Sequence, residues 1–223
     1  MTRALTACSI GILGSGQLGR MLAMAAYELG MEVHVFAPDA DRSPAGAIAH
    51  SAIGASYEDE QALLAFADGV DCITYEFENI PADTVSILEK TGKLFPNAKA
   101  LHIAQDRLME KNFFQSLSIP HAEFQNIDKT QDLMDAFASE SRARILKIRT
   151  LGYDGHGQWR VASQEEAEIA AKELNNRPAI LEEIIPFTKE LSVIIARERG
   201  GETAAYEASE NIHENQILHH SKV

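Results

Sequence analysis

The first hundred residues alternate between short apolar runs and segments with helical periodicity. Leu18, Leu22 and Leu29 recur along one face of a predicted helix over 17–29, and Gly30 follows where left-handed backbone is common. The other predicted helices here are 61–67 and 82–90, and the predicted strands are 9–13, 32–36, 72–75 and 94–95. This strand–helix alternation predicts an α/β fold that begins with an open parallel sheet of βα units, covered by helices on both faces.

The second part of the chain has a different pattern. It opens with a predicted helix over 106–117, a turn at Ile119-Pro120 and a helix around 131–138. A β-rich block follows, interrupted by one predicted helix at 165–174. We therefore predict two domains, over 1–98 and 99–223, with a small β-rich lobe at about 119–187 in the second.

A lysine within an apolar strand precedes a glycine-rich loop. Lys147 lies in the apolar run 145–148, and Gly152, Gly155 and Gly157 follow within a few residues. A strand lysine and the backbone N–H groups of such a loop together suit a nucleotide phosphate. The loop lacks the Gly-Lys-Ser/Thr ending of a Walker A motif. A glycine-rich hairpin leading into Trp159 is the alternative.

Carboxylates stand at the ends of the next two apolar strands. Glu182 and Glu183 follow Ile180-Leu181, and Glu190 precedes a second apolar run. An ionised carboxylate only accepts hydrogen bonds, so Glu190 suits the hydroxyl groups of a ribose. Solvated strand ends are the alternative, because glutamates are usually exposed. Together with Lys147, the series favours a nucleotide site.

Composition and charge exclude several classes of protein. The 223 residues are 45% hydrophobic, enough for a sizeable core, and carry a net charge of −13, which argues against a nucleic-acid partner. Cys8 and Cys72 are too few for a disulfide framework. No apolar run approaches the roughly 18 residues of a membrane span, and the first residues do not read as a secretory signal, so we expect no membrane association and a cytoplasmic protein.

The segment Gly14-Ser-Gly-Gln-Leu-Gly19 matches the fingerprint of dinucleotide-binding folds. A nicotinamide-dependent oxidoreductase would also need an acid at the end of the second strand. That end reads Phe36-Ala37-Pro38, with Asp39 beyond the proline, so this alternative loses its second support. A non-catalytic nucleotide-binding module remains a possible alternative function.

Glu76 and Glu78 lie two residues apart at the carboxyl end of an apolar strand, where open α/β sheets bind ligands. A solvated strand end is the alternative.

Three segments resemble one family. They are Gly14-Ser-Gly-Gln-Leu-Gly-Arg-Met21, Tyr75-Glu-Phe-Glu-Asn-Ile-Pro81 and Gly152-Tyr-Asp-Gly-His-Gly-Gln158. The chain resembles the ATP-grasp superfamily and, within it, the 5-(carboxyamino)imidazole ribonucleotide synthase family. The resemblance implies a pre-ATP-grasp domain, then the first part of an ATP-grasp domain, in a ligase that often forms homodimers.

The resemblance also implies a reaction and a set of site residues. Bicarbonate attacks the γ-phosphate of ATP to give carboxyphosphate, and the amine of 5-aminoimidazole ribonucleotide then takes the carboxyl group, with Mg²⁺ bridging phosphate oxygens. Residues expected at the ribonucleotide are Gly14, Gly16, Gln17, Leu18 and Glu76. Glu76, Tyr153 and Asp154 are expected in catalysis. Residues expected at ATP are Arg107, Lys147, Gly152, Tyr153, Asp154, Gly155, His156, Gly157, Gln158, Glu182, Glu183, Ile184, Ile185, Glu190 and His213.

No acidic pair on apolar strands precedes Val223 in the pattern expected for Mg²⁺ ligands. Glu207, Glu210 and Glu214 lie in polar surroundings. We therefore expect a C-terminally truncated chain whose metal ligands lie beyond Val223 and whose own activity is doubtful. Another ATP-grasp enzyme is the nearest alternative: a formate-dependent glycinamide ribonucleotide transformylase begins similarly, but has a serine-rich loop where this chain has Tyr153-Asp154.

Overall fold

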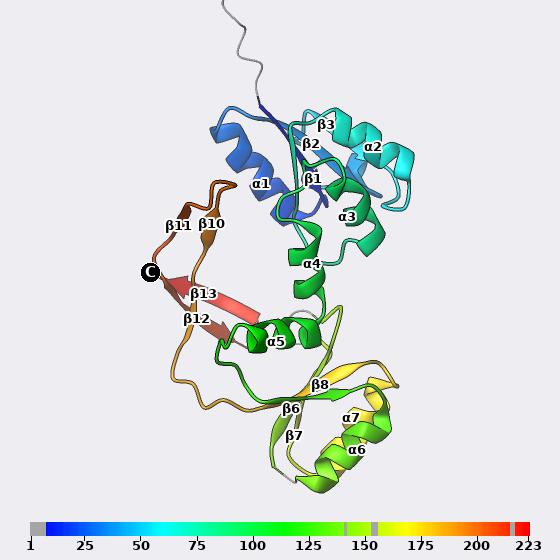
Figure 1. Cartoon of the computed structure of the whole chain (residues 1–223), viewed down its shortest axis with the longest axis vertical. Coiled ribbons are helices and arrows are strands. Elements are labelled where there is room, and N and C mark those ends of the chain that lie inside the picture. Colours follow the sequence, from blue (N-terminus) through cyan, green and yellow to red (C-terminus); the bar gives the residue numbers. More distant parts are fainter. Residues whose placement is uncertain (1–7, 141, 153–155, 215–216) are drawn as a thin grey trace, which may run out of the picture. The chain divides into compact units, whose positions relative to one another are not determined.

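The computed structural model describes residues 8–140, 142–152, 156–214 and 217–223. The chain forms two compact units, Met1–Glu110 and Lys111–Val223. Figure 1 shows the helices and strands of the chain.

The first unit is built on a parallel sheet with strand order β3-β2-β1-β4. Its strands are β1 (Ser9–Leu13), β2 (Glu32–Ala37), β3 (Ser51–Gly54) and β4 (Cys72–Tyr75). Its helices are α1 (Gln17–Glu28), α2 (Glu60–Asp68), α3 (Ala82–Glu89) and α4 (Ala98–Gln105), with a short 3₁₀ helix at Ala40–Arg42. The expected parallel sheet of βα units is thereby confirmed.

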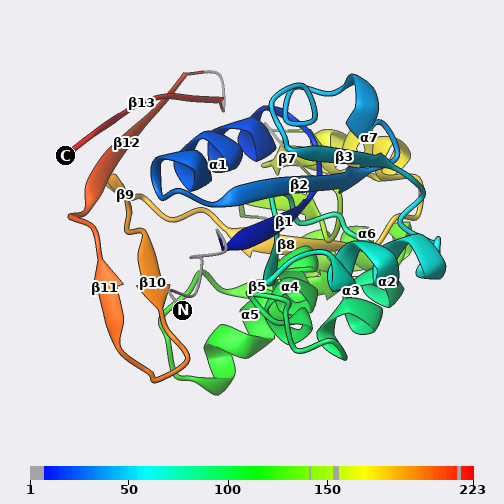
Figure 2. The same cartoon turned by 90° about the horizontal axis from the view of Figure 1, so that it is seen from above.

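Neighbouring residues of β1 face two separate cores. Ile12 packs in a cluster with Ala23 of α1, whereas Leu13 packs with Leu63 and Phe66 of α2 and with residues of α3 and α4. Side chains alternate along a strand, so this short strand supplies both layers. Figure 2 shows α1 on one side of the sheet and α2 and α3 on the other.

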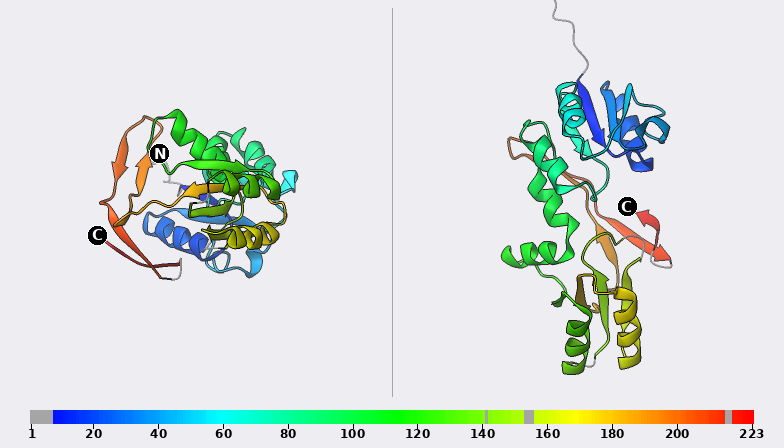
Figure 3. Two further views of the ribbon diagram at one scale, coloured as in Figure 1. Left: turned by 90° about the horizontal axis from the view of Figure 1, so that it is seen from below. Right: turned by 90° about the vertical axis from the view of Figure 1, so that its right-hand side faces the viewer.

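The second unit contains an antiparallel sheet with strand order β5-β8-β6-β7. Its strands are β5 (Phe124–Ile127), β6 (Arg144–Ile148), β7 (Gln158–Val161) and β8 (Ala179–Glu183). Helices α6 (Thr130–Ser139) and α7 (Gln164–Leu174) lie side by side and bury one face of it (Figure 3). Leu133 of α6, Leu174 of α7 and Leu146 of β6 share that core. The opposite face of this sheet is not covered by α6 and α7.

The remaining elements are α5 and a set of short strands. Helix α5 (Arg107–Ser116) crosses from one unit into the next. Strands β9 (Glu190–Ser192), β12 (Ser209–Glu214) and β13 (Ile217–Lys222) form an antiparallel sheet, and β10 (Ile195–Arg197) pairs with β11 (Thr203–Ala205). These strands expose large apolar side chains, including Leu191, Ile195 and Ile217. Among the described residues, no helix is both long and apolar enough to cross a membrane.

Candidate functional site

The glycine turn between β1 and α1 encloses the carboxylate of Glu76. Glu76 directly follows β4, and its Oε1 and Oε2 accept the N–H groups of Gly16 at 2.8 Å and Gly19 at 2.9 Å. Gly14 has a φ of +100°, and a Cβ there would lie 2.3 Å from the Glu76 Cγ. The glycines therefore make room for a carboxylate of the chain itself, at a helix N-terminus that favours an anion.

The predicted ribonucleotide residues gather around this turn. Gly14, Gly16 and Glu76 are in contact, and Gln17 and Leu18 form the exposed first turn of α1 beside them. Glu78, by contrast, is exposed, and its carbonyl oxygen accepts a hydrogen bond from Gln105 Nε2 at 2.6 Å. The two glutamates thus differ in environment, although they are only two residues apart.

Asp39 is tied to the same turn. Ser15 Oγ donates to Asp39 Oδ1 at 2.8 Å, linking the ends of β1 and β2. Tyr57 packs against Phe36 and Phe77 nearby, and burial, followed by the charges of Glu76 and Asp39, raises the pKa of its hydroxyl. A nicotinamide-binding fold would keep the acid at this strand end for a ribose. Here that acid holds the glycine turn.

In the second unit, Lys147 lies on the face of the sheet opposite α6 and α7. Leu146 and Ile148 are buried against the helices, so Lys147 between them points the other way. Lys147 Nζ lies 2.6 Å from Glu182 Oε2, and Lys111 Nζ of α5 lies 3.1 Å from Glu182 Oε1. Each oxygen of one carboxylate therefore meets a different ammonium group.

Glu182 is ionised in this arrangement although only 5% of the residue is exposed. Burial alone would raise the pKa of the Glu182 carboxyl, but the hydrogen bond and charge of Lys147 and the charge of Lys111 hold it below the usual range. One carboxylate between two lysines leaves a net charge of one positive unit. The sheet face therefore presents a cation that suits a phosphate.

The glycine-rich loop joins β6 to β7 beside this lysine. Gln158 is paired directly with Lys147 in the strand register, so both side chains belong to one face. The Gly157 carbonyl accepts the N–H of Ile148 at 2.9 Å, and Gly157 has a φ of +73°. A Cβ at Gly157 would lie 2.3 Å from Ile148 Cδ1. The loop is thus held close against β6 at its end.

The other predicted loop residues differ in how far they can be placed. Gly152 and the exposed His156 flank the centre of the loop. Tyr153, Asp154 and Gly155 lie outside the described residues, so their expected roles stay predictions.

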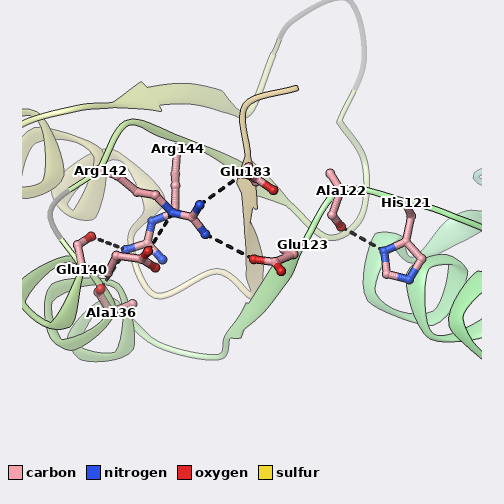
Figure 4. A network of polar contacts seen from close by, with 8 residues as sticks. All are labelled: His121, Ala122, Glu123, Ala136, Glu140, Arg142, Arg144 and Glu183. Atoms are coloured by element: carbon pink, nitrogen blue, oxygen red, sulfur yellow. Dashed lines mark hydrogen bonds and ion pairs between the residues drawn. The ribbon is translucent and has the colours of Figure 1, made fainter. Parts of the chain in front are cut away.

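Glu183 faces away from Lys147. Its side chain lies 3.1 Å from Arg142 Nη1, within a network on the helix side that includes Glu123 and Glu140 (Figure 4). Arg144 Nη2 also joins this network, donating to the carbonyl oxygens of Ala136 and Glu140. The adjacent cavity of about 120 Å³ is smaller than a nucleotide pocket. Only the backbone of Glu183 remains available to a ligand on the Lys147 face.

The segment after β8 supplies the remaining predicted adenine contacts. Ile184 is half-buried and Ile185 is 46% exposed.

Glu190 and His213 lie together on neighbouring strands. His213 Nδ1 is 3.6 Å from Glu190 Oε1, and Asn211 Nδ2 donates to the same oxygen at 3.3 Å. Strands β9 and β12 are antiparallel, which brings these residues together. The predicted ribose acceptor and the predicted nucleotide-side histidine therefore form one group.

Lys111 was not among the residues predicted from the sequence. Arg107, which begins α5, was predicted, but Lys111 follows four residues later and binds Glu182. Residues at this spacing lie on one side of a helix, so the pattern Arg-x-x-x-Lys was an available signal.

The described residues do not form a recognisable metal site. In the described ranges, no three histidine, cysteine, aspartate or glutamate side chains approach closely enough to hold an ion. The expected Mg²⁺ therefore has no set of ligands there.

Comparisons with known proteins define the class. The model of the ribonucleotide synthetase preATP-grasp domain matches residues 7–105, and that of the ATP-grasp domain matches residues 112–223. The chain belongs to the ATP-grasp family.

Several similar proteins are named N5-carboxyaminoimidazole ribonucleotide synthase. N5-carboxyaminoimidazole ribonucleotide synthase of Brucella melitensis is 44% identical over 217 residues, 96% of this chain and 60% of that protein. The structure of the ADP complex of such a synthetase has a TM-score of 0.90 and 40% identity, covering 99% of this chain and 59% of its own. The Aspergillus clavatus enzyme with ADP and 5-aminoimidazole ribonucleotide has a TM-score of 0.81 at 27% identity, covering 95% of this chain and 55% of its own. The chain thus spans about 60% of the length of these relatives.

Proposed function

We propose that this chain supplies the ribonucleotide side and part of the ATP site of an ATP-dependent carboxylating ligase. The reaction joins bicarbonate to 5-aminoimidazole ribonucleotide and gives N5-carboxyaminoimidazole ribonucleotide, ADP and phosphate, a step of purine biosynthesis in the cytoplasm. The observation that carries the proposal is Lys147, a strand lysine paired with buried Glu182 and directly opposite Gln158 at the end of the glycine loop. The names and ligands of the relatives support the substrates.

On the nucleotide side, the residues act by position and charge. Lys147 neutralises phosphate oxygens, and the N–H groups of the glycine loop bind the same anion. Arg107 adds a second cation. The backbone of Ile184 and Ile185 lines the adenine, and Glu190 accepts from the ribose hydroxyls.

His213 contacts Glu190 and holds its carboxylate in place. Mg²⁺, when bound, would supply positive charge that offsets the charge of the phosphates. The described residues do not provide its ligands, so no step of the reaction is assigned to the metal.

In the proposed ribonucleotide site, only some backbone N–H groups of the glycine turn are available to the substrate. Glu76 already occupies the N–H groups of Gly16 and Gly19. A substrate phosphate would therefore bind at the first turn of α1 through the N–H groups of Gln17 and Leu18. Tyr153 and Asp154 of the loop are assigned to the transfer of the carboxyl group, on the strength of the family resemblance.

The substrate is tested by an ATP hydrolysis assay on the product of the complete reading frame. With bicarbonate present, 5-aminoimidazole ribonucleotide should stimulate release of phosphate, and glycinamide ribonucleotide should not. Formation of the N-carboxylated product would be followed with ¹³C-bicarbonate by NMR. Stimulation by glycinamide ribonucleotide and formate instead would overturn the proposal in favour of a transformylase. Sedimentation of the same product tests the homodimer that the family resemblance suggests.

A further inference from the structure

Lys111, Lys147 and Glu182 form a cluster of three charged side chains. Lys111 is the one member that has no role in the proposed nucleotide site. It reaches Glu182 from α5, whereas Lys147 reaches Glu182 from β6. All three side chains are largely withdrawn from solvent, with 15% of Lys111, 23% of Lys147 and 6% of Glu182 exposed. Charged groups at this depth interact more strongly than exposed ion pairs, so the charge balance of the cluster matters.

The net charge of the cluster changes if the ammonium group of Lys111 is removed. Lys147 and Glu182 alone would form a neutral pair with a short contact of 2.6 Å. A phosphate approaching Lys147 would then compete with the Glu182 carboxylate for a single ammonium group, because no second cation is left to pair with Glu182. With Lys111 in place, the carboxylate has its own counter-ion on the other oxygen.

We propose that Lys111 is a positioning residue that neutralises Glu182 and so leaves the positive charge of Lys147 available to the phosphates of a nucleoside di- or triphosphate. This inference rests on the proposed nucleotide site and adds to it a residue without any direct contact to the ligand. Lys111 sets the strength of phosphate recognition, and the adenosine part of the ligand is bound independently of it.

The test separates phosphate recognition from all other binding. The affinities of this chain for ADP and for adenosine are measured by NMR titration, and their ratio reports the contribution of the phosphates. Lys111→Met keeps the length of the side chain without its charge, and should lower the ratio roughly fivefold to tenfold, less than the loss of a direct charge-assisted contact because Lys111 acts through Glu182. Lys111→Arg should restore most of the ratio. Lys172→Met, on the exposed side of α7, is the matched control and should leave it unchanged.

Replacing Glu182 should change the ratio of ADP to adenosine affinity in the opposite direction. Glu182→Gln removes the competing anion and should raise the ratio, and Lys111→Met combined with Glu182→Gln should return it close to the wild-type value. These two variants decide the question even if Lys111→Met alone does not fold. An unchanged ratio of ADP to adenosine affinity in Lys111→Met, or a lower ratio in Glu182→Gln, would overturn the proposed role of Lys111 but not the proposed nucleotide site. A wild-type chain that binds neither ADP nor ATP would overturn the proposed nucleotide site itself.

Discussion

The Oε1 atom of Glu76 accepts the N–H group of Gly16 at 2.8 Å, across the turn that the dinucleotide fingerprint describes. In dinucleotide-binding folds, the corresponding helix N-terminus receives the pyrophosphate of the ligand. Here the chain places its own carboxylate there, and the glycine pattern is explained by space for that side chain. The same sequence motif therefore serves a different anion.

Replacing Glu76 tests this arrangement. Glu76→Ala leaves the N–H groups of Gly16 and Gly19 without their acceptor, so the free energy of unfolding should fall by about 1–3 kcal/mol. Urea denaturation followed by circular dichroism measures the change. Glu78→Ala is the control, because Glu78 is exposed, and should change stability by less than about 0.5 kcal/mol. Equal effects of the two substitutions would contradict the role of Glu76.

Gly157 is predicted to be intolerant of a side chain. Gly157→Ala combines a φ of +73° with a Cβ only 2.3 Å from Ile148 Cδ1, and should destabilise the chain by about 2–4 kcal/mol. Gly30 has the same φ of +73° but open space around its Cβ, so Gly30→Ala should cost only about 1 kcal/mol. Thermal unfolding of both variants measures the difference. If Gly30→Ala were the more destabilising, the close packing of the loop against β6 would not hold.

Removing Lys147 should weaken nucleotide binding directly. Lys147→Ala takes away a charge-assisted contact, and the affinity for ATP should fall by about 1.5–3 kcal/mol. Isothermal titration calorimetry measures it, with Lys172→Ala as the control for loss of a lysine on an exposed helix face. Unchanged ATP affinity would remove Lys147 from the site.

The pH dependence of stability should contain a contribution from Glu182. The pKa of its carboxyl is lowered in the folded chain, from an ordinary value of 4.5, despite the opposing effect of burial. The stabilisation is therefore fully present above about pH 4.5 and is lost as the pH falls through the lower folded value. Urea denaturation between pH 3 and 7 should show this loss in the wild type, and a smaller one in Glu182→Gln. Parallel pH profiles for the two proteins would contradict it.

Periodicity was enough to predict the bounds of α1, α2, α3 and α7 within one residue at each end. The face of α1 was predicted wrongly, because Leu18, Leu22 and Leu29 are exposed and its buried residues are Gly19, Ala23 and Ala26. Periodicity missed β3 and β5, each only four residues long, and α4, which contributes Leu101 to the core. Short segments carry too few residues to show a period, and their structure depends on the partners they pair with.

At the site, residue types predicted the charges but not the directions of side chains. The adjacent residues Glu182 and Glu183 were both expected at ATP, yet they face opposite sides of the sheet. The spacing of Lys111 from Arg107 is a local signal, but the contact of Lys111 with Glu182, 71 positions away in sequence, is not revealed by any local pattern.

In strand β8, neighbouring residues on opposite faces of the sheet are chemically alike. Ile180 and Leu181 are both buried, and Glu182 and Glu183 are both bound to cations. A slip of one residue would exchange each side chain for one of similar chemistry, so β8 contains little information about its own alignment. The central partner β6 is different, because Leu146 and Lys147 cannot exchange places without burying an ammonium group among the core side chains. Correct pairing of this sheet during folding therefore depends on β6, and substitutions there should favour misaligned states more than substitutions in β8.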